Sequence, residues 1–199
     1  MRLFGYTCGK DGQPICGAVV EIKDTNFQTL YRTESDEHGF YQIDVANAVY
    51  PFVAAVKDYG VRYLEYWCQN LDLNQDQRLD VRFDTLEIYG LHPFWIKGGL
   101  NALMVYFRPM SLDKFQKGER DIAPELECIQ VTLDGKAAEI LVHNQVRESI
   151  GDRELTAYLI HVSNPNEQRR WNRLDLELWD SKGNYGAATF FCSEISSLH

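Results

Sequence analysis

The sequence has few basic residues and no long apolar run. Its 20 Lys and Arg residues face 29 Asp and Glu residues, which gives a formal net charge of −9. The acids are in excess in both halves, with 13 acids against 8 bases in residues 1–84 and 16 against 12 in the rest. Because nucleic-acid binding depends on clustered Lys and Arg, no nucleic-acid partner is expected. No run approaches the ~18 apolar residues of a membrane span, so no membrane insertion is expected either.

Signals for secretion, metal binding and cofactor binding are also missing. The N-terminus has no apolar core of the kind that a signal peptide contains, which predicts a cytoplasmic location. The five cysteines are scattered without a CxxC pair, as is typical of reduced thiols. Cys8 and Cys16 flank one predicted turn, so a disulfide between them stays open as an alternative. The histidines are isolated, and no P-loop, GxGxxG or HExxH occurs, so neither a cofactor nor a metal is expected.

What the sequence does contain is a succession of short strands separated by polar turns. Residues 79–83 show the pattern, because Leu79, Val81 and Phe83 alternate with Asp80 and Arg82. Seven such segments within about 85 residues predict a small antiparallel β-sandwich. The segments are residues 3–8, 15–23, 29–35, 40–45, 52–57, 61–67 and 79–83.

The second half repeats this style. The apolar alternation changes phase at Thr85, which predicts a domain boundary there without a flexible linker. Residues 86–199 are expected to form a second β-sandwich, Ig-like or related, so that the fold class is all-β with two tandem sandwiches. Its strands are predicted at residues 102–107, 127–133, 138–143, 156–162, 174–179 and 187–191. Residues 111–125 form a long polar loop, and such loops are often functional.

The segment "ESDEHGFYQIDV", residues 34–45, is the densest cluster of chemically active side chains. In a strand–turn–strand interpretation, Asp36 accepts backbone N–H groups and Gly39 supplies a positive φ. Phe40 then begins a strand whose side chains alternate between two faces. The alternative is a metal site made by Asp36, Glu37 and His38. Adjacent residues in an extended chain point to opposite faces, so the turn is favoured.

Part of this segment also belongs to a longer pattern that resembles a known family. Gly12-Gln13-Pro14, Gly17-Ala18-Val19 and the run from Asp36 to Tyr41 resemble the carboxypeptidase regulatory-like domain, over about residues 1–85. The resemblance implies a transthyretin-like, seven-stranded sandwich. It implies no single function, because such modules accompany enzymes, adhesins and transporters alike.

Candidate ligand-binding residues gather around the predicted domain junction. Trp67 and Trp95 combine a large apolar ring with a polar N–H, a combination enriched at interfaces. Arg108 ends an apolar strand and could clamp a carboxylate or phosphate. Asp113 and Asp121 lie in the loop that follows. We therefore expect a non-catalytic binding or scaffold module, with carbohydrate as the preferred ligand and a protein partner or self-association as the alternative.

A hydrolase is the competing hypothesis. It would use carboxylates of the 111–125 loop as a glycosidase-like pair, drawn from Asp113, Glu119, Asp121 and Glu125. It predicts a deep pocket where two of these acids converge and at least one has a perturbed pKa.

Overall fold

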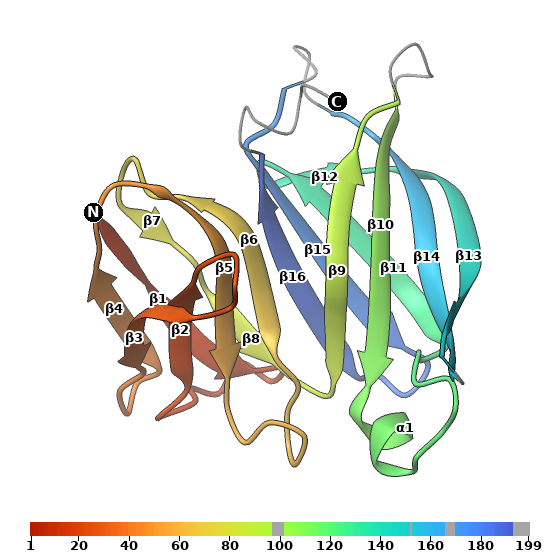
Figure 1. Ribbon diagram of the computed structural model, residues 1–199, viewed down its shortest axis with the longest axis horizontal. Helices are drawn as coiled ribbons and strands as arrows, with labels where there is room; N and C mark the ends of the chain where they lie inside the picture. Colours follow the sequence, from red (N-terminus) through yellow and green to blue (C-terminus); the bar gives the residue numbers. More distant parts are fainter. Residues whose placement is uncertain (97–101, 152, 166–169, 193–199) are drawn as a thin grey trace.

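The computed structural model describes residues 1–96, 102–151, 153–165 and 170–192, which form sixteen strands and one short helix (Figure 1). The strands pack as two β-sandwiches in tandem, so the expected all-β class is confirmed. Pairing is antiparallel except where β1 meets β7 and β8 and where β16 meets β6. Within the described residues, no helix has the length and apolar character needed to cross a membrane.

The first sandwich contains the first eight strands. They are β1 (Arg2–Gly9), β2 (Val19–Lys23), β3 (Thr29–Glu34), β4 (Phe40–Asp44), β5 (Val49–Val56), β6 (Tyr66–Asp72), β7 (Gln77–Arg78) and β8 (Val81–Phe83). The second sandwich contains the remaining elements. They are β9 (Leu86–Phe94), β10 (Ala102–Ser111), α1 (Leu112–Gln116), β11 (Leu126–Leu133), β12 (Lys136–Ala138), β13 (Ile140–Ile150), β14 (Arg153–Ser163), β15 (Arg173–Asp180) and β16 (Tyr185–Phe191).

One eight-stranded sheet runs through both sandwiches. Its order is β12-β11-β15-β16-β6-β5-β2-β3, and β16 of the second half pairs with β6 of the first. In this pairing Ala188 lies opposite Trp67. The other layer of the first sandwich consists of β1, β4, β7 and β8, and that of the second is the sheet β13-β14-β10-β9. The division into residues 1–85 and 86–199 stays a prediction, because a shared sheet crosses it.

Strand β16 is buried on both faces because a hydrophobic core lies on each side of it. Ala188 and Phe190 belong to the core of the second sandwich, whereas Phe191 belongs to the core of the first. Tyr66 of β6 is also in the first core, so its neighbour Trp67 points to the opposite face of the shared sheet. The outer layers of the two sandwiches therefore cover opposite faces of the shared sheet.

The interpretation of residues 34–45 as a turn is confirmed. Asp36 Oδ1 accepts the backbone N–H groups of His38 and Phe40, both at 2.9 Å. Gly39 has a φ of +76°, and β4 begins directly after it. The side chains of His38 and Glu37 are exposed. Asp36 therefore stabilises the backbone of the turn, whereas Glu34 and Asp44 lie near Arg32 and Arg2.

One predicted strand is wrong. Residues 61–67 were expected to be extended, but β6 begins only at Tyr66 and the preceding residues form a loop. Asp58 and Gly60 have positive φ values of +45° and +72°, and Val61 donates its N–H to the Asp58 carbonyl. These left-handed residues turn the chain before it can extend. The resulting loop, residues 57–65, lies at the junction of the two sandwiches.

Gly39 gives a prediction about stability. A Cβ at Gly39 would lie 2.4 Å from the carbonyl oxygen of Thr7, so Gly39→Ala combines a left-handed φ with a clash and should cost about 2–3 kcal/mol. Gly12 is the matched control, because its φ is +78° but no atom lies within 4 Å of an added Cβ. Gly12→Ala should cost about 1 kcal/mol. Urea titration measures both, and equal losses would contradict the close approach to Thr7.

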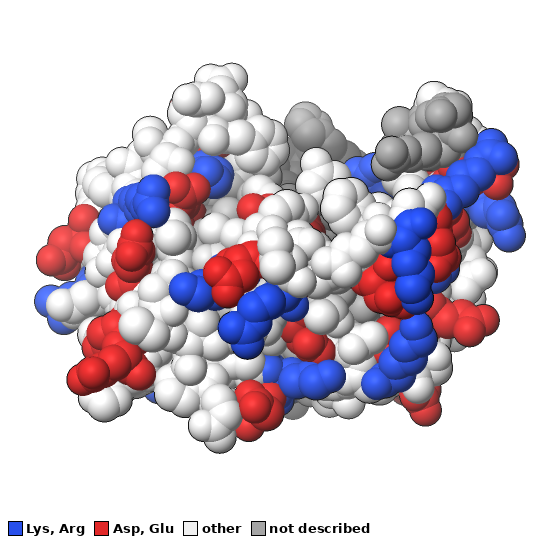
Figure 2. All heavy atoms as spheres, turned by 90° about the horizontal axis from the view of Figure 1, so that it is seen from below, with Lys and Arg blue, Asp and Glu red and all other residues white. Residues whose placement is uncertain are grey.

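Charged side chains of both signs are mixed over the lower face of the molecule. Figure 2 shows Lys and Arg beside Asp and Glu across most of this face, with an elongated run of Lys and Arg at the right that Asp and Glu border. Pairs such as Lys117 with Asp113, at 2.8 Å, account for part of this pattern.

Candidate functional site

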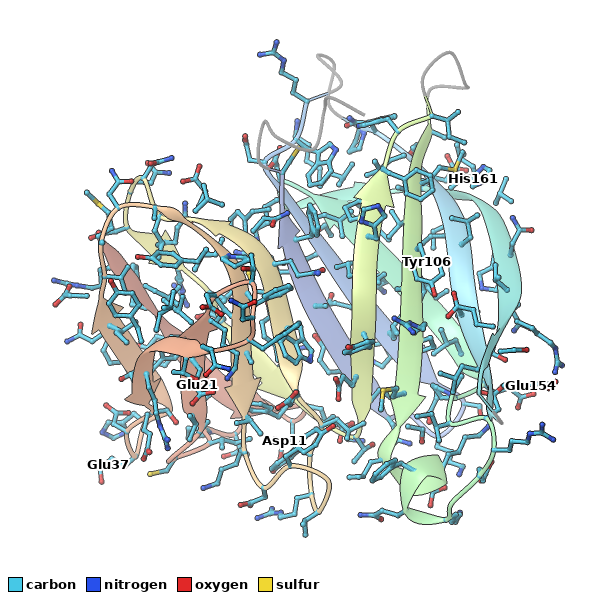
Figure 3. The ribbon with its side chains drawn as sticks, in the orientation of Figure 1. Asp11, Glu21, Glu37, Tyr106, Glu154 and His161 are labelled. Carbon is cyan, nitrogen blue, oxygen red and sulfur yellow. The ribbon has the colours of Figure 1, made fainter. Side chains whose placement is uncertain are left out.

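A groove lies between the two sandwiches, where β6 of the shared sheet meets the edge strand β9. Two adjoining pockets of about 240 and 200 Å³ share Trp67, Tyr89 and Arg108, and together they form what we call the junction groove. Its two central strands, β6 and β9, lie between the labelled Glu21 of β2 and Tyr106 of β10 (Figure 3). The larger pocket is lined by Tyr59, Glu65, Trp67, Glu87, Tyr89, Arg108, Pro109, Met110, Ile122, Ala123, Leu155 and Thr156. The smaller is lined by Phe27, Phe52, Trp67, Gln69, Ile88, Tyr89, Gly90, Leu91 and Arg108.

The alternation of strand β9 explains which side chains reach the groove. Leu86 and Ile88 belong to the core of the second sandwich. Successive side chains of a strand point to opposite faces, so Glu87 and Tyr89 point away from that core. Both line the groove, and Tyr89 is 43% exposed.

A β-bulge at Gly90 places Arg108. The register between β9 and β10 shifts between Tyr106 and Arg108, and Gly90 has a φ of +64°. A Cβ at Gly90 would lie 3.1 Å from Arg108 Nη2, so the glycine leaves room for the guanidinium. Bulges of this kind re-aim side chains and occur often beside functional sites.

The Arg108 guanidinium is held by a ring and an acid. It lies over Tyr89, with Cζ 5.0 Å from the ring centroid, and Nη1 is 3.7 Å from Glu148 Oε2. Glu148 also accepts a hydrogen bond from the Tyr106 hydroxyl. Arg108 Nε is buried and has no hydrogen-bond partner among the described residues. The groove therefore contains one buried N–H donor that is unused.

Glu87 is the complementary group. Its side chain is 2% exposed, and Oε1 accepts a hydrogen bond of 2.9 Å from Trp67 Nε1. Oε2 is buried without a hydrogen-bond partner among the described residues. Burial raises the pKa of Glu87 to about 7, and the nearby Glu65 carboxylate raises it further, against the hydrogen bonds from Trp67 and from the backbone of Glu65. Burial also raises the pKa of Glu65. The groove thus holds two carboxyls that are costly to ionise.

Aromatic rings line the part of the groove nearest β5. Phe27 stacks on Phe52, with centroids 4.6 Å apart, and both rings meet Trp67 edge to face. The Phe27 side chain is exposed. Its backbone φ is +60°, a strained value for a residue other than glycine. The groove therefore joins an apolar, ring-lined half to a half that contains buried polar groups.

Three of the five predicted site residues lie at or beside the groove. Trp67 and Arg108 line it. Asp121 does not line it but fixes one wall, because Oδ2 accepts a hydrogen bond of 2.6 Å from the hydroxyl of Thr156, which does. Burial raises the pKa of Asp121, but hydrogen bonds from Thr156 and Ala123 outweigh it and leave the pKa below its ordinary value.

Trp95 and Asp113 lie elsewhere. Trp95, 37% exposed, follows the end of β9 and lines neither pocket; it is eight residues from Glu87, or roughly 25 Å along an extended chain. Asp113 belongs to α1, where Lys117 and Lys182 lie 2.8 and 3.1 Å from its carboxylate. The hydrogen bonds from these lysines lower its pKa. Both residues are separate from the junction groove.

The acids of the 111–125 loop do not converge in a pocket. Asp113 pairs with lysines on the surface, Asp121 is bonded to Thr156, and Glu119 lies 3.5 Å from Lys114. The hydrolase hypothesis required two of these acids with a perturbed pKa in one cavity. The described residues also contain no group of three His, Cys, Asp or Glu side chains that could hold a metal ion.

Few sequence signals marked the groove residues Tyr59, Glu65, Glu87 and Tyr89. In "LEIYG", residues 86–90, the alternation predicts solvent exposure for Glu87 and Tyr89. Glu87 is buried instead, and Tyr59 and Glu65, from the loop of residues 57–65, line the same pocket. The one local signal was Gly90, since a glycine inside a strand pattern often marks a bulge.

Comparisons with known proteins give a weak likeness. No protein-family model and no curated protein matches the sequence. Among solved structures, the major pilin subunit BcpA of Bacillus cereus is matched at a TM-score of 0.33 and 9% identity, over 95% of this chain and 67% of that one. A DUF3823 family protein from Bacteroides ovatus is matched at a TM-score of 0.31 and 10% identity, over 96% of this chain and 99% of that one. A DUF3823 family protein from Parabacteroides merdae is matched at a TM-score of 0.31 and 9% identity, over 95% of this chain and 97% of that one. At these values the likeness carries no argument about ligand, partner or role.

Proposed function

We propose that this protein is a non-catalytic binding module whose ligand site is the junction groove. The observation that carries the proposal is that Glu87 and Arg108 line one pocket of about 240 Å³ beside the exposed ring of Tyr89. Glu87 Oε2 and Arg108 Nε are both buried there without a hydrogen-bond partner among the described residues. Ligand sites are typically concave and mostly apolar, with a few convergent polar groups that fix orientation.

Carbohydrate is the ligand class that suits this arrangement. A sugar hydroxyl both donates and accepts hydrogen bonds, so one ring can serve an acceptor such as Glu87 Oε2 and a donor such as Arg108 Nε. The apolar face of a sugar can lie against a ring such as Tyr89, as ring faces combine apolar area with a polar edge. A protein partner or self-association would have to reach the same buried atoms with a protruding side chain.

We also infer that the first sandwich is a carboxypeptidase regulatory-like module. The motif residues have the structural duties that such a module needs: Asp36 closes a turn, and Gly39 approaches Thr7 closely. Tyr41 lies in the core of the first sandwich, and its hydroxyl donates to the Leu79 carbonyl at 2.5 Å. A module of this kind is consistent with a binding or scaffold role beside a second domain.

The proposal predicts which aromatic residues matter for binding. On a glycan array, Tyr89→Ala should lower binding at least about tenfold, since a stacking ring contributes of the order of 1 kcal/mol or more and also holds Arg108. Trp95→Ala is the matched control and should leave binding unchanged, because Trp95 lines neither pocket. Loss of binding on Trp95→Ala with retention on Tyr89→Ala would move the site out of the groove. A wild-type protein that binds no glycan would remove carbohydrate as the ligand.

A further inference from the structure

Glu87 Oε2 is the groove atom that most needs a partner. Its side chain is 2% exposed, Oε1 is used by Trp67, and Oε2 has no hydrogen-bond partner among the described residues. A buried polar atom without a partner is costly and uncommon in native structures. Because Glu87 lines the larger pocket, a ligand in the groove can supply the missing donor.

The charges around the groove favour a cationic donor. The two bases nearby are already paired: Lys23 lies 2.5 Å from Glu21, and Arg108 lies 3.7 Å from Glu148. Glu65 and Glu87 line the same pocket, and no described lysine or arginine forms an ion pair with either. The groove therefore contains two acids without an ion-pair partner among the described residues, and one of them, Glu87, is only 2% exposed. Such a site attracts a positive charge more strongly than an exposed surface does.

The walls of the groove select an organic cation. Most of the groove surface comes from Trp67, Tyr89, Phe52 and other carbon-rich side chains, which a hydrated inorganic ion cannot use. Aromatic faces attract an ammonium group within about 6 Å of the ring centroid. A ligand that combines a ring-shaped apolar face with an ammonium group meets both demands.

We propose that the junction groove recognises the ammonium group of an amino sugar. This rests on the proposed carbohydrate-binding function and specifies its ligand. The ammonium group donates to Glu87 Oε2 and offsets part of the negative charge of Glu87 and Glu65. A neighbouring hydroxyl accepts from Arg108 Nε, and the sugar face lies against Tyr89. Charge-assisted hydrogen bonds of this kind are about twice as strong as neutral ones, so they decide between sugars of the same shape.

Three monosaccharides that differ only at C2 test the proposal. They are the methyl β-glycosides of glucosamine, N-acetylglucosamine and glucose, titrated at pH 7.5 and followed by NMR. A single sugar carries at most one charge, which avoids nonspecific attraction of a polycation to an acidic protein. The wild-type protein should bind the glucosaminide at least about tenfold more tightly than either neutral sugar. Glu87→Gln keeps the shape of the side chain and should reduce this preference to less than about threefold.

The outcomes distinguish a failure of the amino-sugar proposal from a failure of the proposed carbohydrate binding. Glu37→Gln removes the same charge at an exposed position, at the lower left of Figure 3, and should keep the full preference. Equal binding of all three sugars would overturn the amino-sugar proposal and leave carbohydrate binding in place. A preference that survives in Glu87→Gln would overturn it too, because the charge would then act from elsewhere. No binding of any sugar would remove the proposed function together with this specification.

Discussion

Replacing Phe191 by alanine is expected to destabilise the first sandwich, although Phe191 belongs to β16 of the second half. The ring is 6% exposed and packs in the core formed by β1 to β8. Truncating a buried phenylalanine costs about 3–5 kcal/mol, through lost burial and the cavity that remains. Hydrogen exchange of the β1 and β5 amides measures the effect, and their protection should fall by the same free energy as global stability.

Phe190 is the matched control for this experiment. It is the neighbouring residue on β16, is also 6% exposed, and packs in the core of the second sandwich. Phe190→Ala should cost a similar amount. If the shared sheet makes the two sandwiches one folding unit, both variants lower protection in both halves. Loss of protection confined to residues 86–192 in Phe191→Ala would show that the first sandwich holds together without β16.

The sequence predicted the strands better than it predicted how they assemble. Alternation marked β8, Val81–Phe83, within the predicted range 79–83, and Asp36 with Gly39 marked a turn, because both signals come from neighbouring residues. The pairing of β6 with β16 joins Trp67 to Ala188, which lie far apart in the sequence. No local pattern encodes that contact. In the sequence, a strand buried on both faces, such as β16, shows only a short apolar run without alternation.

The candidate site was predicted in part for a similar reason. Trp67 stood out because its ring combines apolar area with an N–H, and Arg108 because a guanidinium can clamp an acid; both line the groove. Glu87 could not be found, because its burial depends on residues outside its own strand, including the loop of residues 57–65. That loop exists because Asp58 and Gly60 turn the chain where the apolar residues favoured a strand. A site made by a loop and a strand edge has no signature in either segment alone.

Replacing Glu87 by glutamine is expected to stabilise the protein at pH 8 by up to about 3 kcal/mol. Burial raises the pKa of Glu87 from its ordinary 4.5 to about 7 in the folded state. Between these two values the folded protein keeps the proton and the unfolded chain releases it. The protonated side chain therefore supports the fold fully below pH 4.5, and this support is lost as the pH rises through 7. Glutamine, which stays neutral, avoids the loss.

The difference between wild type and variant isolates Glu87 from the other titrating groups, because those groups are common to both proteins. Urea titrations at pH 4.5, 6 and 8 should give a gap that opens from near zero to its full size. Glu37→Gln, where the side chain is 84% exposed, should show no such opening. A gap that stays constant with pH would mean that Glu87 ionises as easily in the fold as in water. In that case Oε2 already has a partner, and the groove no longer needs a cation to satisfy it.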